Sequence, residues 1–159
     1  MDALAWLYSH YSEDVYRFIL CLSGDQALAE DIISEVFIRV WDAPEPTRTA
    51  TARAYLFAIA RNLFLNEIRR RARHPSRDEQ MADAAPGPER SAERNAALGK
   101  IQHALQQLPE ADRAALLMRA LHQLSYREIG AALHLSPGAA RVRVHRARFK
   151  LAHLKSVME

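Results

Sequence analysis

The chain has 159 residues, of which 49% are hydrophobic and 26% are charged, as in a globular protein with one ordinary domain or two small ones. This composition excludes a chain that is disordered throughout. The single cysteine, Cys21, excludes an intramolecular disulfide and a cysteine-based zinc site. The start lacks the basic segment of a secretory signal, and no apolar run approaches the ~20 residues that span a membrane, so we expect a cytoplasmic protein.

The net charge of +3 conceals a segregation of charge along the chain. Residues 1–47 hold nine acidic side chains against two arginines, whereas residues 48–77 hold eight arginines against one glutamate. Residues 78–112 are acidic again, and residues 113–159 hold nine basic side chains against two acidic ones. Two basic blocks separated by an acidic one indicate two contacts with a polyanion. The alternative is that these charged faces are simply solvated.

The first half of the chain has apolar residues at helical spacing, and no strand pattern of any length interrupts them. The spacing predicts three helices over roughly 3–22, 26–42 and 50–73. Tyr8 is expected to face inward from the first of these and Ile68 from the third. An all-α fold follows from the pattern.

The segment 74–92 differs from its surroundings, because it contains three prolines and one glycine and shows no periodicity. This composition predicts a flexible linker. A compact domain rarely contains so long a loop without structure, so the linker is expected to separate two small helical domains, 1–73 and 93–159. Four helices are expected in the second domain, over about 93–107, 110–122, 126–133 and 137–153.

A helix-turn-helix pattern lies near the C-terminal end. Ser125 and Glu128 form an S-x-x-E capping box that begins a short helix, and Ser136 with Pro137 begins the next one after a tight turn. Gly130 would let the two helices approach closely. The second helix presents a buried stripe and an exposed cluster of arginines, as a reader of the DNA major groove requires. The alternative is an ordinary basic helical hairpin.

A second face remains on the helix 26–42 once its core stripe is removed. It is acidic but also contains an isoleucine and a tryptophan, and its members are Asp31, Ser34, Glu35, Ile38, Trp41 and Asp42. A tryptophan in an acidic surface is a plausible anchor for a protein partner. The alternative is that Trp41 folds back onto the core.

The helix 50–73 combines aromatic residues with arginine and asparagine, which suits single-stranded nucleic acid because bases stack on rings and phosphates pair with Arg. Tyr55 and Arg61 are examples. The alternative is that most of the aromatic side chains belong to the core, and for Phe57 and Phe64 this alternative is preferred.

Three stretches together resemble the extracytoplasmic-function (ECF) branch of bacterial sigma factors. The stretch AEDIISEVFIRVW at 29–41 resembles the helix that binds core RNA polymerase. The stretch AYLFAIARNL at 54–63, followed by Arg69-Arg70-Arg71, resembles the helix that melts the promoter and reads the −10 element. The QLPE sequence at 107–110 and the helix-turn-helix resemble the domain that reads the −35 element. The resemblance covers nearly the whole chain and implies sigma domains two and four joined by a linker.

The resemblance implies a role for each matching residue. Core RNA polymerase would be contacted by Asp31, Ser34, Glu35, Ile38 and Trp41. The −10 non-template strand would be held by Arg61, Asn62, Asn66, Arg69 and Arg70, and the loop 42–50 would help to capture a flipped base. In the −35 region, Ala139, Arg143 and Arg146 would face the major groove, and Arg141 and Arg148 would contact phosphates.

Several positions depart from the family pattern. Ser34 stands where glutamine is usual, and Tyr55 stands where tryptophan is common. His134 replaces the usual turn glycine, so a positive φ there would be costly. Ala139 and Ala140 replace a pair like Thr-Val, so the −35 contact at position 139 is expected to be apolar or absent.

The resemblance also implies partners. They are core RNA polymerase, promoter DNA and an anti-sigma factor that is often anchored in the membrane, and the free chain is expected to be a monomer. We expect no enzyme activity, no cofactor and no metal site, because the histidines lack ligand spacing and no glycine-rich phosphate loop is present. Two other interpretations stay open: a dimeric DNA-binding regulator that never meets polymerase, and a helical adaptor or sequestering protein.

Overall fold

The computed structural model describes residues 2–43, 51–74 and 92–158, so most of the expected linker and residues 44–50 of the expected −10 loop lie outside the described residues. Every element in the described ranges is a helix, which confirms the all-α fold. The helices are α1 (Ala3–Ser23), α2 (Gln26–Asp42), α3 (Ala52–Arg73), α4 (Ala92–Gln106), α5 (Glu110–Ala120), α6 (Tyr126–Leu133) and α7 (Pro137–Met158). None of them is both long and apolar enough to cross a membrane.

Helices α1, α2 and α3 each begin at a side chain that caps the first turn. Asp2, Asp25 and Thr51 accept hydrogen bonds from backbone N–H groups of α1, α2 and α3, which satisfies donors that have no partner within the helix. Gly24 ends α1 in the left-handed region at φ 71°, where a residue without a Cβ carries no steric penalty. The caps therefore set the sharp reversal between α1 and α2.

The core of the first three helices is aromatic and aliphatic. Phe18 and Phe57 are buried edge to face, with ring centroids 4.8 Å apart. The expectation that Phe57 and Phe64 belong to the core is confirmed. Two other expectations are wrong: Tyr8 and Ile68 are exposed, because Tyr8 lies over the outer edge of Phe37 and Ile68 lies on the outer side of α3.

The helix-turn-helix of α6 and α7 is closed by two backbone features. Ser125 and Glu128 make both hydrogen bonds of the capping box. His134 adopts the left-handed conformation at φ 60°, as its position in place of a turn glycine predicts. At Gly130, a Cβ would lie 2.4 Å from the carbonyl oxygen of Leu135, so only glycine fits. The expected inner stripe of α7 is confirmed by the burial of Ala140, Val144 and Ala147.

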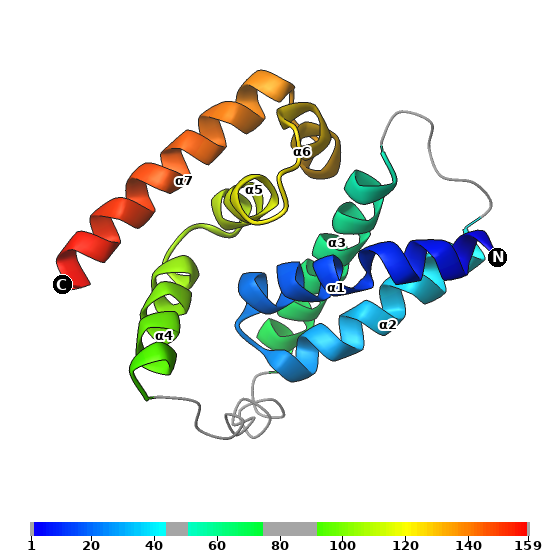
Figure 1. Ribbon diagram of the computed structural model, residues 1–159, viewed down its shortest axis with the longest axis horizontal. Helices are drawn as coiled ribbons and strands as arrows, with labels where there is room; N and C mark the ends of the chain where they lie inside the picture. Colours follow the sequence, from blue (N-terminus) through cyan, green and yellow to red (C-terminus); the bar gives the residue numbers. More distant parts are fainter. Residues whose placement is uncertain (1, 44–50, 75–91, 159) are drawn as a thin grey trace.

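The two groups of helices, α1–α3 and α4–α7, pack against each other. Helix α1 contacts α4 and α5, and the start of α3 contacts α6, whereas α7 lies at the outer edge of the molecule, on the side of α5 and α6 that faces away from α1–α3 (Figure 1). Buried Arg113 of α5 connects the groups, because its guanidinium donates to the carbonyls of Leu105 and Leu108 and, at 2.6 Å, to that of Leu22 at the end of α1. This contact satisfies carbonyls that a helix end leaves unpaired.

Candidate functional site

The second face of α2 is exposed along its whole length. Asp31, Ser34, Glu35 and Ile38 are exposed, and Trp41 has 65% of its surface accessible. The alternative that Trp41 folds back onto the core is therefore wrong. The helix thus presents an apolar pair beside a row of acidic groups, and tryptophan is a residue type that is enriched in protein–protein interfaces.

A groove of about 380 Å³ separates this acidic face from the second half of α3. Asp31, Glu35, Leu63 and Arg70 are among its lining residues. Arg70 donates from Nε and Nη2 to the Glu67 carboxylate at 3.0 and 2.6 Å, and this pairing is the largest cause that lowers the pKa of Glu67. The groove therefore contains expected polymerase-contacting residues and one expected DNA-contacting residue side by side.

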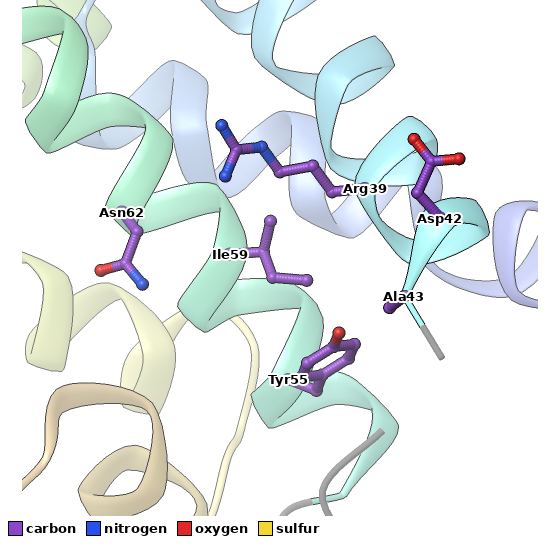
Figure 2. A pocket seen from close by; sticks show the side chains of 6 residues that line it. All are labelled: Arg39, Asp42, Ala43, Tyr55, Ile59 and Asn62. Atoms are coloured by element: carbon purple, nitrogen blue, oxygen red, sulfur yellow. The ribbon is translucent and has the colours of Figure 1, made fainter. Parts of the chain in front are cut away.

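A second pocket, also of about 380 Å³, lies between the end of α2 and the first half of α3 (Figure 2). Arg39, Asp42 and Ala43 come from α2 and its end, while Tyr55, Ile59 and Asn62 come from α3. The pocket combines an aromatic ring with a guanidinium, a carboxylate and an amide. Such a set can stack on a planar ring and also donate and accept hydrogen bonds at its edge. We call it the Tyr55 pocket.

Arg61, which is expected to contact the −10 strand, instead forms an ion pair within the molecule. Its Nε and Nη2 donate to the two carboxylate oxygens of Glu110 at 2.8 and 2.7 Å, and both side chains are largely buried. Asn62, Asn66 and Arg69 lie on the exposed side of α3, where Arg69 donates to Asn66 at 3.4 Å. In this arrangement, Asn62, Asn66 and Arg69 are accessible on α3 to a DNA strand, whereas Arg61 is not.

A second cross-connection joins the start of α3 to the start of α6. Thr51 donates to Glu128 at 2.7 Å, and Arg53 donates to the other Glu128 oxygen at 3.3 Å. Burial alone would raise the pKa of Glu128, but the backbone N–H of Ser125, the Thr51 hydroxyl and the Arg53 charge together hold that pKa below its usual value. The sequence analysis identified Glu128 as a capping residue only.

His122 lies at the same junction and is only 8% exposed. Its ring packs against Phe57 and Phe18, with centroids 4.8 and 6.0 Å away. Its Nε2 is buried and has no hydrogen-bond partner among the described residues. Burial is the main reason that the pKa of His122 is lowered to about 4. Sequence reasoning missed this residue, since nothing in the local pattern distinguishes it.

The first turns of α7 carry the residues expected at the −35 element. Ala139, Arg141, Arg146 and Arg148 are exposed. Arg143 is placed differently, because its Nη1 donates at 3.1 Å to Asp112 of α5, a carboxylate that is only 2% exposed. Lys150 donates to the other oxygen of Asp112 at 3.2 Å. The ends of the basic side chains on this side of α7 therefore help to hold α7 to α5.

Comparison with known proteins identifies both halves. The pattern of Sigma-70 region 2 matches residues 7–74, and the pattern of Sigma-70 region 4 matches residues 98–151. The chain is 36% identical to the ECF RNA polymerase sigma factor SigE of Mycolicibacterium smegmatis, over 91% of this chain and 58% of that protein. It is 35% identical to the ECF RNA polymerase sigma factor SigL of Mycobacterium tuberculosis, over 89% of this chain and 82% of that protein.

Solved structures give the same result for the fold. The sigma factor RpoE from Bartonella quintana, crystallised with the anti-sigma factor NepR, matches with a TM-score of 0.74 at 26% identity, over 96% of each chain. CnrH, solved with the cytosolic domain of CnrY, matches with a TM-score of 0.73 at 21% identity, over 99% of this chain and 90% of that one. The helical arrangement is therefore that of RpoE and CnrH.

Proposed function

Since the chain belongs to the family of ECF RNA polymerase sigma factors, we propose that it binds core RNA polymerase in the cytoplasm and directs it to promoters by reading −10 and −35 elements. The observation that carries this proposal is the pairing of an exposed face on α2, bearing Trp41, with a polar aromatic pocket at the end of the same helix. Polymerase performs the chemistry, and this chain selects the start site.

The α2 face is the proposed contact with polymerase. Ile38 and Trp41 supply the apolar anchors, and Asp31, Ser34 and Glu35 supply the polar surroundings. Truncation of an interface hot spot weakens binding by about 2 kcal/mol or more, and tryptophan is among the residue types most enriched at hot spots. The acidic groups favour a partner surface that is basic.

The Tyr55 pocket is the proposed site for one unstacked base of the −10 element. Unstacking a base costs a few kcal/mol, and stacking on an aromatic ring returns about 1–3 kcal/mol. Tyr55 provides that ring, and Asn62 and Asp42 are placed to meet the edge of the base. Asn66 and Arg69 would hold the strand beside it, and Arg61 would join them once Glu110 releases it.

The two family patterns match different halves of the chain, and we divide the proposed roles between these halves. We assign residues 1–73 to polymerase binding and −10 reading, 74–92 to a linker, and 93–159 to −35 reading. Arg141 and Arg148 would contact phosphates, and Ala139 and Arg146 would face the groove. Arg143 would reach the groove only by leaving Asp112. Because RpoE was solved with the anti-sigma factor NepR, we also assign an anti-sigma factor as a partner of this chain.

The test is gel filtration of the chain with bacterial core RNA polymerase. The wild type is expected to co-elute with polymerase, and the variant Asp31→Arg/Glu35→Arg is expected to elute alone. Glu13→Arg, which reverses an exposed charge on α1, is the matched control and should co-elute. If neither the wild type nor the control co-elutes, and no anti-sigma factor has co-purified, the proposal is wrong and a dimeric regulator on a palindromic site becomes the alternative.

A further inference from the structure

An apolar side chain stands exposed in the middle of the basic surface of α7. Val142 has 56% of its surface accessible, although Ala140 and Val144 on either side of it are fully buried. On a helix, residues three and four apart are neighbours on one face. Ala139, Val142 and Arg146 therefore form one exposed row that begins in the first turn of the helix. An exposed valine is unremarkable alone, but here it interrupts a row of expected DNA readers.

The charges around this row favour nucleic acid as the occupant. Arg141, Arg146 and Arg148 are all exposed on the same helix. Together they form a surface that attracts phosphates. A protein with a basic surface would be repelled by these arginines, and a protein with a neutral surface would gain no electrostatic attraction from them.

Arg143 is the side chain on α7 that would otherwise compete for base contacts. Its hydrogen bond to buried Asp112 holds it toward α5. If this bond broke, Asp112 would keep only its hydrogen bond from Lys150 among the described residues. Since Asp112 is 2% exposed, this loss is costly, because a buried charge needs its hydrogen bonds. The row of Ala139, Val142 and Arg146 is thus an exposed part of α7 that can meet base edges without the loss of this contact.

The major groove offers few groups to an apolar side chain. Each base edge there presents hydrogen-bond donors, acceptors or both, and thymine alone among the unmodified bases adds a methyl group, on C5. Ala139 and Val142 carry only methyl groups beyond the backbone, so they can bury that group but cannot pair with the polar ones. Arg146, in contrast, has the two parallel donors that match guanine O6 and N7.

On the basis of the proposed function, we propose that Val142, with Ala139, recognises the C5-methyl group of thymine in the −35 element, and that Arg146 supplies the neighbouring polar contact to guanine. The chain would thus select its −35 element through a buried methyl contact. Loss of one buried methyl group corresponds to a roughly fourfold weaker affinity.

The experiment begins with holoenzyme, assembled from this chain and bacterial core polymerase, and a DNA pool that is randomised over the −35 hexamer. Each thymine of the selected element, on either strand, is then replaced in turn by deoxyuridine, which lacks only the methyl group. Affinity is measured by competition at constant salt, since phosphate contacts make binding salt-dependent. We expect one or two positions at which deoxyuridine binds about fourfold more weakly with the wild type.

The variant Val142→Ala assigns the effect to this side chain. At one such position, it should reduce the difference between thymine and deoxyuridine to less than twofold, while Phe149→Ala should leave it unchanged. Phe149 is the matched control because it is 78% exposed on the same helix and lies two turns further along. Both substitutions remove exposed groups, so the helical circular dichroism of both variants should equal that of the wild type.

Each other outcome overturns the inference in a recognisable way. If an element is selected but deoxyuridine binds as tightly as thymine at every position, the methyl contact does not exist. If Val142→Ala keeps the full methyl effect at every such position, Val142 does not make the contact. In both cases the inference is wrong and the sigma function stands. If Val142→Ala changes binding to polymerase without DNA, the row is a protein contact. If the holoenzyme selects no sequence at all, the proposed function fails and this inference fails with it.

Discussion

Arg61 and Glu110 form a bidentate ion pair that joins the α3 helix to the first turn of α5, with nitrogen–oxygen distances of 2.8 and 2.7 Å. Parallel donation to two oxygens is also how arginine binds a phosphate group. The carboxylate of Glu110 therefore occupies Arg61 in the way that a DNA phosphate would. Glu128 also accepts from Arg53 at the start of α3, but through a single hydrogen bond of 3.3 Å. A strand that uses both arginines has to displace both glutamates.

The first prediction concerns this competition. The variant Glu110→Gln/Glu128→Gln should bind single-stranded DNA more tightly than the wild type, by up to about tenfold, because hydrogen bonds to charged groups contribute roughly 1.5–3 kcal/mol each and both pairs are partly solvated. Glutamine at position 128 retains the capping box, so α6 should keep its start. Fluorescence anisotropy with a labelled oligonucleotide measures the change.

Glu13→Gln is the control for this experiment. Glu13 also pairs with an arginine, Arg17, but both partners are exposed on α1, so this variant releases neither an arginine of α3 nor the contact between the two groups of helices. If Glu13→Gln tightens DNA binding as much as the double variant does, the loss of negative charge explains the gain. The explanation that the two glutamates compete with DNA for the arginines would then be wrong.

The second prediction concerns the exposed ring on α2. Trp41→Ala should weaken binding to core polymerase by about 2 kcal/mol or more, since buried tryptophans dominate many interfaces. Its effect on the free energy of unfolding should stay within about 0.5 kcal/mol, because the ring is 65% exposed in the free chain. Urea unfolding and a polymerase titration measure the two quantities. Trp6→Ala, an exposed tryptophan on α1, should leave polymerase binding unchanged.

The third prediction concerns His122 and pH. Its pKa is lowered from 6.5 to about 4 in the folded chain, so the unfolded chain binds the additional proton first as the pH falls. The contribution of His122 is therefore constant above about pH 7 and becomes destabilising between pH 6.5 and 4. By pH 5, the free energy of unfolding should fall by about 2 kcal/mol because of this residue.

His122→Phe isolates that contribution. Phenylalanine fits the aromatic surroundings and retains the backbone carbonyl that accepts from Arg53 at 3.2 Å. The difference in unfolding free energy between wild type and variant should change by about 2 kcal/mol from pH 7.5 to pH 5. A difference that is independent of pH would mean that His122 has the same pKa in the folded and the unfolded chain, so that its ring is accessible to water in the folded chain.

Local structure could be predicted from the sequence, because its causes are local. The bounds of α2 and α6 follow from caps and periodicity, and the left-handed turn follows from the place of His134 in the pattern. Contacts between distant elements could not be predicted in this way. Periodicity places Arg143 on the polar circumference of α7, but the buried carboxylate of Asp112 draws it toward α5.

The same limit applies to the candidate site. The residue types on α3 indicated nucleic acid, yet nothing in the spacing indicated that Glu110, which is 49 residues away from Arg61, would meet it. Periodicity describes one helix at a time, whereas docking of two helical groups depends on the shapes of both surfaces. The exposed row on α7 was also incomplete in the sequence analysis, because Val142 is neither charged nor on the core stripe.

The fourth prediction concerns the turn of the helix-turn-helix. The left-handed conformation costs a non-glycine residue about 1–2 kcal/mol, and a substitution by glycine removes this cost. Glycine has more conformational freedom in the unfolded chain, which offsets about 0.5–1 kcal/mol of that gain. His134→Gly should therefore raise the free energy of unfolding by about 0.5–1 kcal/mol, given φ 60° at that position. Urea unfolding above pH 7 measures it, and His134→Val should lower the stability instead.

Gly130 and Gly138 form a matched pair for the close approach between α6 and α7. Alanine normally stabilises a helix by about 1 kcal/mol over glycine, and at Gly138 a Cβ would meet nothing within 4 Å. Gly138→Ala should therefore be neutral or stabilising. At Gly130, the Cβ would lie 2.4 Å from a backbone oxygen that cannot rotate away, so Gly130→Ala should cost about 1–3 kcal/mol or more. Equal effects at the two positions would show that α6 and α7 are further apart than this contact requires.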